Sequence, residues 1–231
     1  MSGVANSALA YPPRLRMLVL ASGLASLIVA SLYLYVLLYP QYFFSGYIQG
    51  YASLTGYELW YSTSGKAIYL SNLSVVKIVS FLTYLYVASL LGVSVASIFF
   101  LLLFRRPVLS ASLAYGSVLS LVVAMGVLRF LAQAFQADVN RILSLARRPG
   151  ELLVYRTTAG LVEFTGVEAR ETLAHSLLFK QGILLQGALA AALALSMSSI
   201  IWILYIQGRQ AHEPPKLKSS EDSSQRPLNN N

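Results

Sequence analysis

Long apolar blocks dominate the pattern of the chain. Four of them cover residues 17–39, 78–104, 108–128 and 183–206, and none contains Asp, Glu, Lys, Arg or His. Each block reaches the roughly 20 residues that a helix needs to cross the hydrocarbon core of a bilayer. The first block is longer than the core of a signal peptide and ends at a proline, so we interpret it as a retained span. The pattern therefore predicts four transmembrane helices.

The segment after the third block continues a helical pattern. Apolar residues recur at helical spacing over 129–148, with charged residues on the other face, and Pro149-Gly150 follows. We expect the third span to continue as one helix to about residue 148. Residues 149–182 then predict a hairpin over 151–165, rich in β-branched and aromatic residues, and a helix that resumes near Val167.

The segment 40–77 also predicts a hairpin, over residues 57–70, with strands at 57–63 and 66–70. Before it, Phe43, Tyr47 and Tyr51 recur every four residues. This spacing indicates a short surface helix between Pro40 and Leu54. The many tyrosines of this segment are typical of a membrane interface.

The two hairpins resemble each other, since both begin with Glu-Leu and continue through an apolar stretch, Tyr and Thr to Gly. An internal duplication of span, hairpin and span would explain this, and so would chance similarity of two generic hairpins. We expect the hairpins to lie side by side in one four-stranded sheet, because an isolated hairpin is marginally stable. The outer-domain residues that we expect to take part in interactions are Trp60, Tyr61 and Tyr155.

Composition supports a membrane protein, because 56% of the residues are hydrophobic and only 11% are charged. The net charge is +8, but basic residues flank membrane spans, and no aromatic–basic motif indicates nucleic-acid binding. The chain has no cysteine, which excludes disulfides, thiol nucleophiles and thiolate metal sites. The predicted fold class is a membrane all-α four-helix transmembrane bundle with a small extracytoplasmic β-hairpin/helix module.

The basic residues near the spans predict the orientation. They precede the first span, form the turn 105–107 and follow the fourth span: Arg14, Arg16, Arg105, Arg106, Arg209, Lys216 and Lys218. The positive-inside rule places this side in the cytoplasm, with segment 1–16 and the polar, disordered tail 207–231. Residues 129–182 carry seven Lys and Arg, but their length weakens that contrary signal. We therefore expect a multi-pass cell-membrane protein, N-in and C-in.

Small residues at four-residue spacing predict how the helices pack, because close van der Waals approach drives association in lipid. We expect these stripes to form a tight bundle, or in one case to mediate oligomerisation. The residues are Ala88, Gly92 and Ala96 in the second span, Gly116, Ser120 and Ala124 in the third, and Gly187 and Ala191 in the fourth.

Candidate chemistry is sparse. Glu171 and His175 are four residues apart and are weak candidates for two metal ligands, which Asp138 could approach from the preceding helix. A solvated charge pair is the favoured explanation of these two residues. The spans lack the histidines of haem carriers and the charges of coupled transporters. We expect no enzymatic activity and no cofactor. Asn72-Leu73-Ser74 is a glycosylation sequon on the predicted outer side.

Four spans with an outer sheet and a long third helix resemble the layout of the claudin-like tetraspan proteins. Gly56-Tyr57-Glu58-Leu59-Trp60 is similar to that family's Gly-Leu-Trp element. The family's outer loop carries two cysteines, which this chain lacks. The resemblance concerns layout, and no functional residue is transferred from it.

These features favour a non-catalytic accessory or assembly subunit, or a surface interaction protein, with an outward-facing interaction domain. Its expected partners are the lipid bilayer and a membrane protein or further copies of the chain. One alternative is a receptor-like sensor with a ligand in the outer domain. Another is a transporter or pore component that is active only as an oligomer. The short inner loops disfavour the sensor, and the uncharged spans disfavour the transporter.

Overall fold

The computed structural model describes residues 11–62, 65–67, 73–146, 153–157, 160–164 and 167–212. Four long helices are present: α1 (Pro13–Leu38), α2 (Leu73–Leu102), α3 (Pro107–Ala146) and α5 (Gly182–His212). All four are long and apolar enough to cross a membrane, which confirms the four predicted spans. Prolines begin α1 and α3, where the missing N–H costs no helical hydrogen bond.

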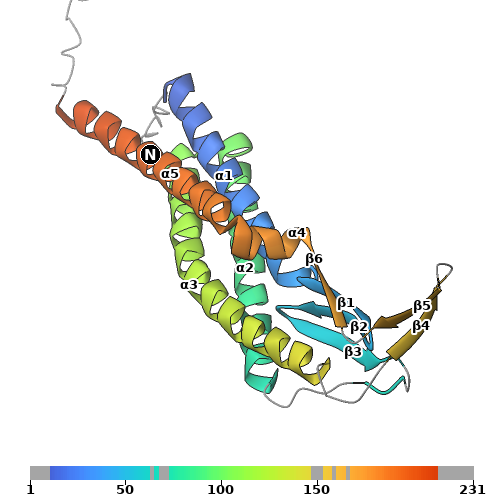
Figure 1. Ribbon diagram of the computed structural model, residues 1–231. Coiled ribbons are helices and arrows are strands. Elements are labelled where there is room, and N and C mark those ends of the chain that lie inside the picture. The colour runs from blue at the N-terminus through green and yellow to red at the C-terminus, as the bar shows by residue number, and fades with distance from the viewer. Residues whose placement is uncertain are drawn as a thin grey trace, which may run out of the picture.

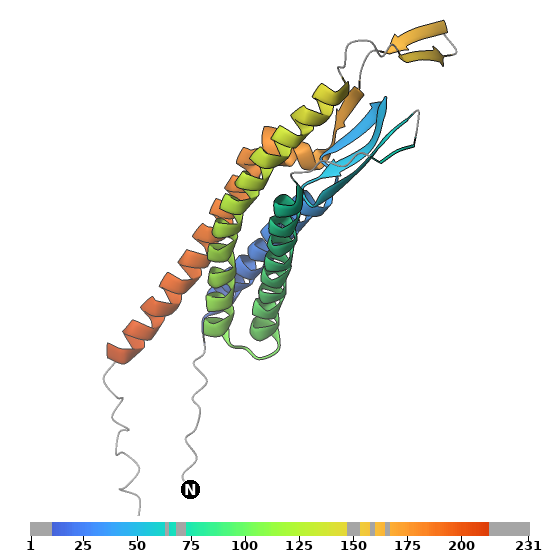
Figure 2. The same ribbon diagram turned by 90° about the horizontal axis from the view of Figure 1, so that it is seen from below.

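The helices form one bundle in which α1 and α3 are the central pair. Each of these two contacts the other and also packs against α2 and α5 (Figure 1). α3 has 40 residues, which corresponds to about 60 Å of helix, or about twice the hydrocarbon thickness of a bilayer. It therefore extends beyond the apolar part of the bundle and reaches the strands, as Figure 2 shows.

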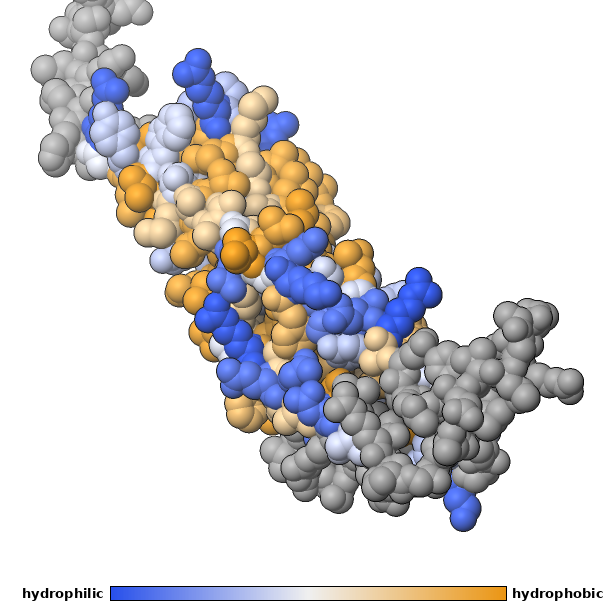
Figure 3. All heavy atoms as spheres, in the orientation of Figure 1, coloured by the Kyte–Doolittle hydropathy of each residue, from blue (hydrophilic) through white to orange (hydrophobic). Residues whose placement is uncertain are grey.

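The bundle has two distinct ends. The strands lie at one end, which we call the sheet end, and the start of α1, the α2–α3 loop and the end of α5 lie at the other (Figures 1 and 2). We call the second the arginine end, because Arg14, Arg16, Arg105, Arg106 and Arg209 lie there. Figure 3 shows hydrophobic residues over the helices between hydrophilic residues at both ends.

Four antiparallel strands form the main sheet, in the order β3-β2-β1-β6. They are β1 (Tyr42–Gly46), β2 (Ile48–Ser53), β3 (Gly56–Tyr61) and β6 (Val167–Glu171). β4 (Leu153–Thr157) and β5 (Gly160–Phe164) form a separate hairpin. The first loop therefore supplies three strands of the main sheet, and the second loop adds the fourth beside β1.

The structure corrects several expected strands. Residues 40–54 form β1 and β2 rather than a surface helix, because the aromatic residues of this segment alternate between the two faces of the sheet. β3 pairs with β2, and Trp60 bridges Ala67 only by an isolated pair. The expected strand at 66–70 otherwise lies outside the described residues. Residues 167–171 form β6 instead of the start of a helix.

The hairpin over 151–165 is present as β4 and β5, but it does not join the other sheet. Among the described strands, the two segments with similar sequences are the last strand of the first loop and the first strand of the second. Part of the first expected hairpin, residues 68–70, lies outside the described residues, so the duplication stays a prediction. The expected helix after 167 begins only at α4 (Leu173–His175), which leads through a π-helical turn (Ser176–Lys180) into α5.

The sheet covers the end of the bundle with an apolar inner face. Tyr42, Phe44, Ile48 and Leu59 are buried there, and the ring centroids of Tyr42 and Phe135 of α3 lie 6.0 Å apart. Trp60 is on the opposite face and is exposed. One face of the protruding part of α3, which includes Phe135, is thus covered by the sheet, while Phe130 on another face stays exposed.

The inner faces of the helices differ from the predicted stripes. Gly92, Gly116, Gly187 and Ala191 are exposed on the outside of the bundle, whereas Ala124 is buried, and Ala88, Ala96 and Ser120 are half-buried. An added Cβ at any of the three glycines would meet no atom within 4 Å. The glycines of these stripes therefore lie away from the helix contacts of the bundle.

Serine residues occupy the inner faces instead. Ser26 of α1, Ser94 of α2 and Ser117 of α3 are buried and bonded to one another, with Oγ–Oγ distances of 2.7, 3.0 and 2.9 Å. A second contact joins Ser97 Oγ to the Ser110 carbonyl at 2.8 Å. Because lipid offers no alternative partners, such bonds across helices hold the bundle in one register.

The structure also changes the bounds of two predicted segments. α1 begins at Pro13, inside the expected 1–16 terminus, and α5 extends to His212, so residues 207–212 of the expected tail are helical. The rest of that tail lies outside the described residues.

Candidate functional site

The sheet end carries a groove of about 540 Å³ where α1, β1 and the end of β6 meet. We call it the aromatic groove. Its lining residues are Tyr35, Tyr39, Phe43, Arg170, Glu171, Thr172 and Leu173. The rings of Tyr35 and Tyr39 stack with centroids 5.0 Å apart and form one wall.

The backbone around the groove is fixed by Gln41, which is fully buried between α1 and β1. Its side-chain amide donates to the Val36 carbonyl at 2.7 Å and so satisfies one of the free carbonyls at the end of α1. Its backbone N–H donates to the Ala52 carbonyl at 2.7 Å. The turn from helix to sheet is therefore held by a polar side chain that follows Pro40.

Thr172 ties the second loop to this turn. Its hydroxyl donates to the Pro40 carbonyl at 2.5 Å, and its N–H donates to the Gln41 carbonyl at 3.1 Å. The same hydroxyl accepts a hydrogen bond from the His175 N–H and caps α4. The groove is consequently built from both loops, although more than a hundred residues separate them.

A polar cluster lies behind the groove. The Tyr42 hydroxyl is 3.3 Å from His175 Nε2, which is 3.5 Å from Glu171 Oε1, and Lys180 pairs with the other oxygen of Glu171. His175 is buried and packs between the rings of Tyr42 and Phe179, each at a centroid distance of 4.6 Å. The cluster connects β1, β6, α4 and the π-helical turn.

The charge states of this cluster follow from burial and from Lys180. Burial lowers the pKa of His175, and this outweighs the Glu171 carboxylate, which raises it. The hydrogen bond from Lys180 lowers the pKa of Glu171. Burial, followed by the charge of Glu171, raises the pKa of Tyr42, although a hydrogen bond with Gln136 lowers it. At neutral pH the cluster therefore holds a neutral imidazole, a neutral phenol and one ion pair.

The metal-ligand hypothesis gains no third ligand. Glu171 and His175 do come together, but as the last residue of β6 and a residue of α4 rather than on one continuous helix. Asp138 is buried near Tyr57, where its charge adds to burial in raising the pKa of Tyr57. Within the part of the chain that the structure describes, no three His, Asp or Glu side chains converge to hold a metal ion.

Several apolar side chains of the groove remain exposed. Phe43 is 42% exposed, Tyr39 43% and Leu173 61%. Arg170 lies beside Phe43 on the neighbouring strand, since the two residues are paired in register. Aromatic and arginine side chains of this kind are enriched where proteins bind each other.

The predicted contact residues have different outcomes. Trp60 is exposed on the outer face of the sheet, and Tyr61 packs against Tyr47 with ring centroids 5.2 Å apart. Tyr155 belongs to β4, whose side chains lie outside what the structure describes, and so does Asn72. Neither Trp60 nor Tyr61 lines the aromatic groove.

Sequence reasoning missed Gln41, Tyr42 and Thr172, which build this site. A polar residue directly after the proline that ends the first span was the available signal for Gln41. Thr172 gave none, because its role depends on β6 pairing with β1. Comparison of the chain with protein-family models, curated proteins and solved structures gave no match.

Proposed function

We propose that this four-span membrane protein is a non-catalytic accessory or assembly subunit, and that the aromatic groove binds a membrane-protein partner. The observation that carries the proposal is the groove itself: exposed Phe43, Tyr39 and Leu173 beside Arg170, on a platform held by Gln41 and Thr172. A rigid platform loses little entropy when it binds, which favours affinity.

We propose further that the arginine end is cytoplasmic and that the sheet end lies outside the cell membrane. The described acidic residues, Glu58, Asp138, Glu163, Glu168 and Glu171, belong to the sheet end, while five arginines occupy the other. Lys and Arg near short loops set the orientation, which supports N-in and C-in. The groove then lies at the outer membrane surface, where it meets the extracytoplasmic part of a neighbouring membrane protein.

The orientation is testable because any introduced cysteine is unique in this chain. We expect an impermeant maleimide to label Ser45→Cys on intact cells and Arg105→Cys only after permeabilisation. Both positions are exposed. The opposite labelling pattern would reverse the proposed topology and leave the four spans in place.

The partner is tested by purification in mild detergent. We expect the wild type to elute in a complex of defined stoichiometry, and Phe43→Ala and Leu173→Ala to reduce the recovery of the second component. Phe104→Ala is the control, since Phe104 is also apolar and exposed but lies in the α2–α3 loop at the other end of the bundle. A lone monomer, or equal losses in all three variants, would contradict the proposal. A complex made only of this chain would favour the oligomeric alternative.

A further inference from the structure

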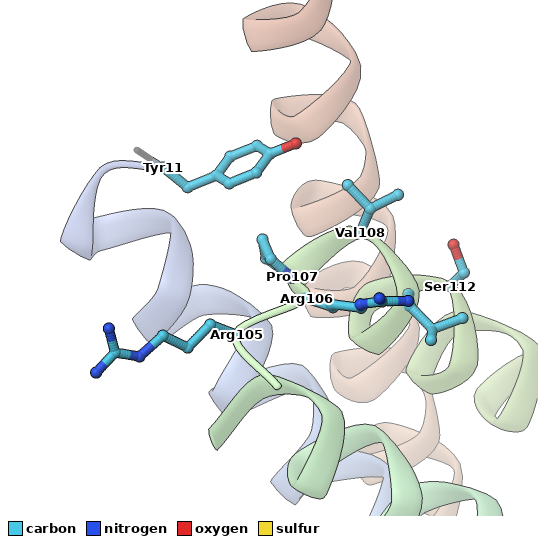
Figure 4. A pocket seen from close by; sticks show the side chains of 7 residues that line it. Tyr11, Arg105, Arg106, Pro107, Val108 and Ser112 are labelled. Atoms are coloured by element: carbon cyan, nitrogen blue, oxygen red, sulfur yellow. The ribbon is translucent and has the colours of Figure 1, made fainter. Parts of the chain in front are cut away.

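The arginine end contains a second concavity that the proposed function does not use. It has a volume of about 490 Å³ and lies between the start of α1, the α2–α3 loop and the start of α3 (Figure 4). We call it the arginine pocket. It is lined by Arg105, Arg106, Tyr11, Ser112, Val108 and Leu109, together with the proline that begins α3.

The electrostatics of the pocket favour an anion. Described segments 11–20, 99–112 and 203–212 carry five arginines and no Asp or Glu, so no carboxylate of these segments neutralises them. Figure 4 shows Arg106 extending toward Ser112, with the Tyr11 ring on the other side of Pro107. The hydroxyl groups of Tyr11 and Ser112 and the guanidinium group of Arg106 thus all line the pocket. A planar guanidinium group can donate two hydrogen bonds at once to the oxygens of a phosphate group.

The start of α3, which borders the pocket, also carries backbone donors. The first hydrogen bond of α3 runs from the Ser110 N–H to the Arg106 carbonyl at 3.1 Å. The N–H groups of Val108 and Leu109 precede it and belong to the helical turn that has no partners within the helix. The dipole of this long helix also favours negative charge at its start, so an anion in the pocket would meet favourable side-chain and backbone electrostatics.

We propose that the arginine pocket binds the phosphate of an anionic phospholipid. The phosphate chemistry alone would also fit a soluble phosphate, but the surroundings favour a lipid. Leu102, Leu103 and Phe104 directly precede the arginines and are exposed on the outside of the bundle. A headgroup in the pocket would place its acyl chains along these side chains, and basic pockets between transmembrane helices recognise such headgroups. The proposal requires only that the chain spans a membrane.

Lipid titration of the purified full-length protein, followed by native mass spectrometry, tests this site. We expect phosphatidylglycerol to bind more tightly than phosphatidylcholine. Arg106→Gln should weaken phosphatidylglycerol binding about tenfold, as expected when a charged hydrogen-bond donor is lost. Arg106→Lys should have an intermediate effect, because it keeps the charge and loses the fork. Arg209→Gln is the matched control at the same end and should change binding less than about twofold.

Three outcomes would overturn the proposal. Equal losses for Arg106→Gln and Arg209→Gln would mean that general positive charge attracts the lipid. Equal binding of both lipids would exclude an anion site. Displacement of phosphatidylglycerol by millimolar inorganic phosphate would assign the pocket to soluble phosphate. If Arg106→Gln does not fold, Tyr11→Phe removes one hydroxyl and keeps the ring, and unchanged lipid preference in both Tyr11→Phe and Arg106→Lys would count against the site.

Discussion

The helical bundle and the four-stranded sheet differ in which kinds of residue they bury. In the sheet, Phe44 and Ile48 face inward while Glu58 and Arg170 face outward, as expected beside water. In α1, Leu24 and Ile28 are exposed while Ser22 and Ser26 are fully buried. Lipid is as apolar as leucine, so burial of apolar surface does not orient a helix. Van der Waals packing does, together with hydrogen bonds such as those of Ser26 to Ser94 and Ser117. Polar residues therefore mark the outside of the sheet and the inside of the bundle.

Glycines show the same contrast within the chain. Gly50 in β2 has a φ of +128°, and an added Cβ would lie 1.9 Å from the Glu58 carbonyl oxygen. Gly23 in α1 is buried, and its Cβ would lie 3.1 Å from Ile98 of α2. Gly92 faces outward with open space around it. The tight positions are thus Gly23 and Gly50, which do not belong to the stripes of small residues predicted from the sequence.

The largest expected effect is at Gly50. Gly50→Ala should destabilise the protein by about 3 kcal/mol or more, because the side chain would require both an unfavourable φ and displacement of β3. Thermal unfolding in detergent measures the change. Gly56→Ala is the control, since its Cβ would meet no atom within 4 Å. Equal stability of the two variants would contradict the described pairing of β2 with β3.

The second largest expected effect distinguishes Gly23, which contacts α2, from Gly92, which faces outward. Gly23→Leu should destabilise the bundle by about 2 kcal/mol, as overpacking does in well-packed interiors. Gly92→Leu should change the stability of the monomer by less than about 0.5 kcal/mol, as is usual for surface positions. Unfolding in a series of SDS concentrations compares both variants with the wild type. A larger loss for Gly92→Leu would place the α2 stripe inside the bundle after all.

Removing one serine of the buried trio should have a smaller effect. Ser94→Ala should cost about 1 kcal/mol, because Ser94 bonds both Ser26 and Ser117 across helices. Ser89→Ala is the control on the same helix, since its exposed hydroxyl donates only to the Tyr86 carbonyl. The same SDS series applies. If both alanine variants unfold alike, the serine contacts do not hold the bundle together.

The smallest effect is a pH dependence at the sheet end. The pKa of His175 is lowered in the folded state, so the unfolded chain binds its proton first as the pH falls. The contribution of the neutral imidazole is present above about pH 6.5 and declines as the pH falls below that value toward the folded-state pKa. We expect wild-type stability to decrease between about pH 7 and pH 5 by less than about 1 kcal/mol.

Variants at the two histidines identify the group responsible. His175→Gln should remove this slope, whereas His212→Gln should retain it, because the chain contains only these two histidines. Glu171, whose pKa is lowered by Lys180, adds a separate loss below its ordinary range near pH 4.5, so the measurement stays above pH 5. A slope that persists in His175→Gln would assign the pH dependence to another group.

Much of the candidate site follows from local patterns, but its assembly does not. Glu171 and His175 were recognisable as neighbours because of their spacing in the sequence. Tyr42 was not, since its contact with His175 spans 133 positions and needs β1 to pair with β6. The spacing of Phe43, Tyr47 and Tyr51 fitted a helix. Pro40 and the two glycines with positive φ, Gly46 and Gly50, instead suit two strands joined by a turn. Short segments of this kind are decided by their partners.

The sequence by itself determined the four apolar helices, the long continuation of the third and the arginine-bearing segments without acidic residues at one end, because length, hydropathy and charge act locally. Only the tertiary structure decided that β6 completes the sheet of the first loop and that serines rather than the glycine stripes face the bundle interior. Strand partners and the inner face of a helix in lipid depend on hydrogen bonds between distant segments. Their free energy is gained only when those segments meet, so no local periodicity reports it.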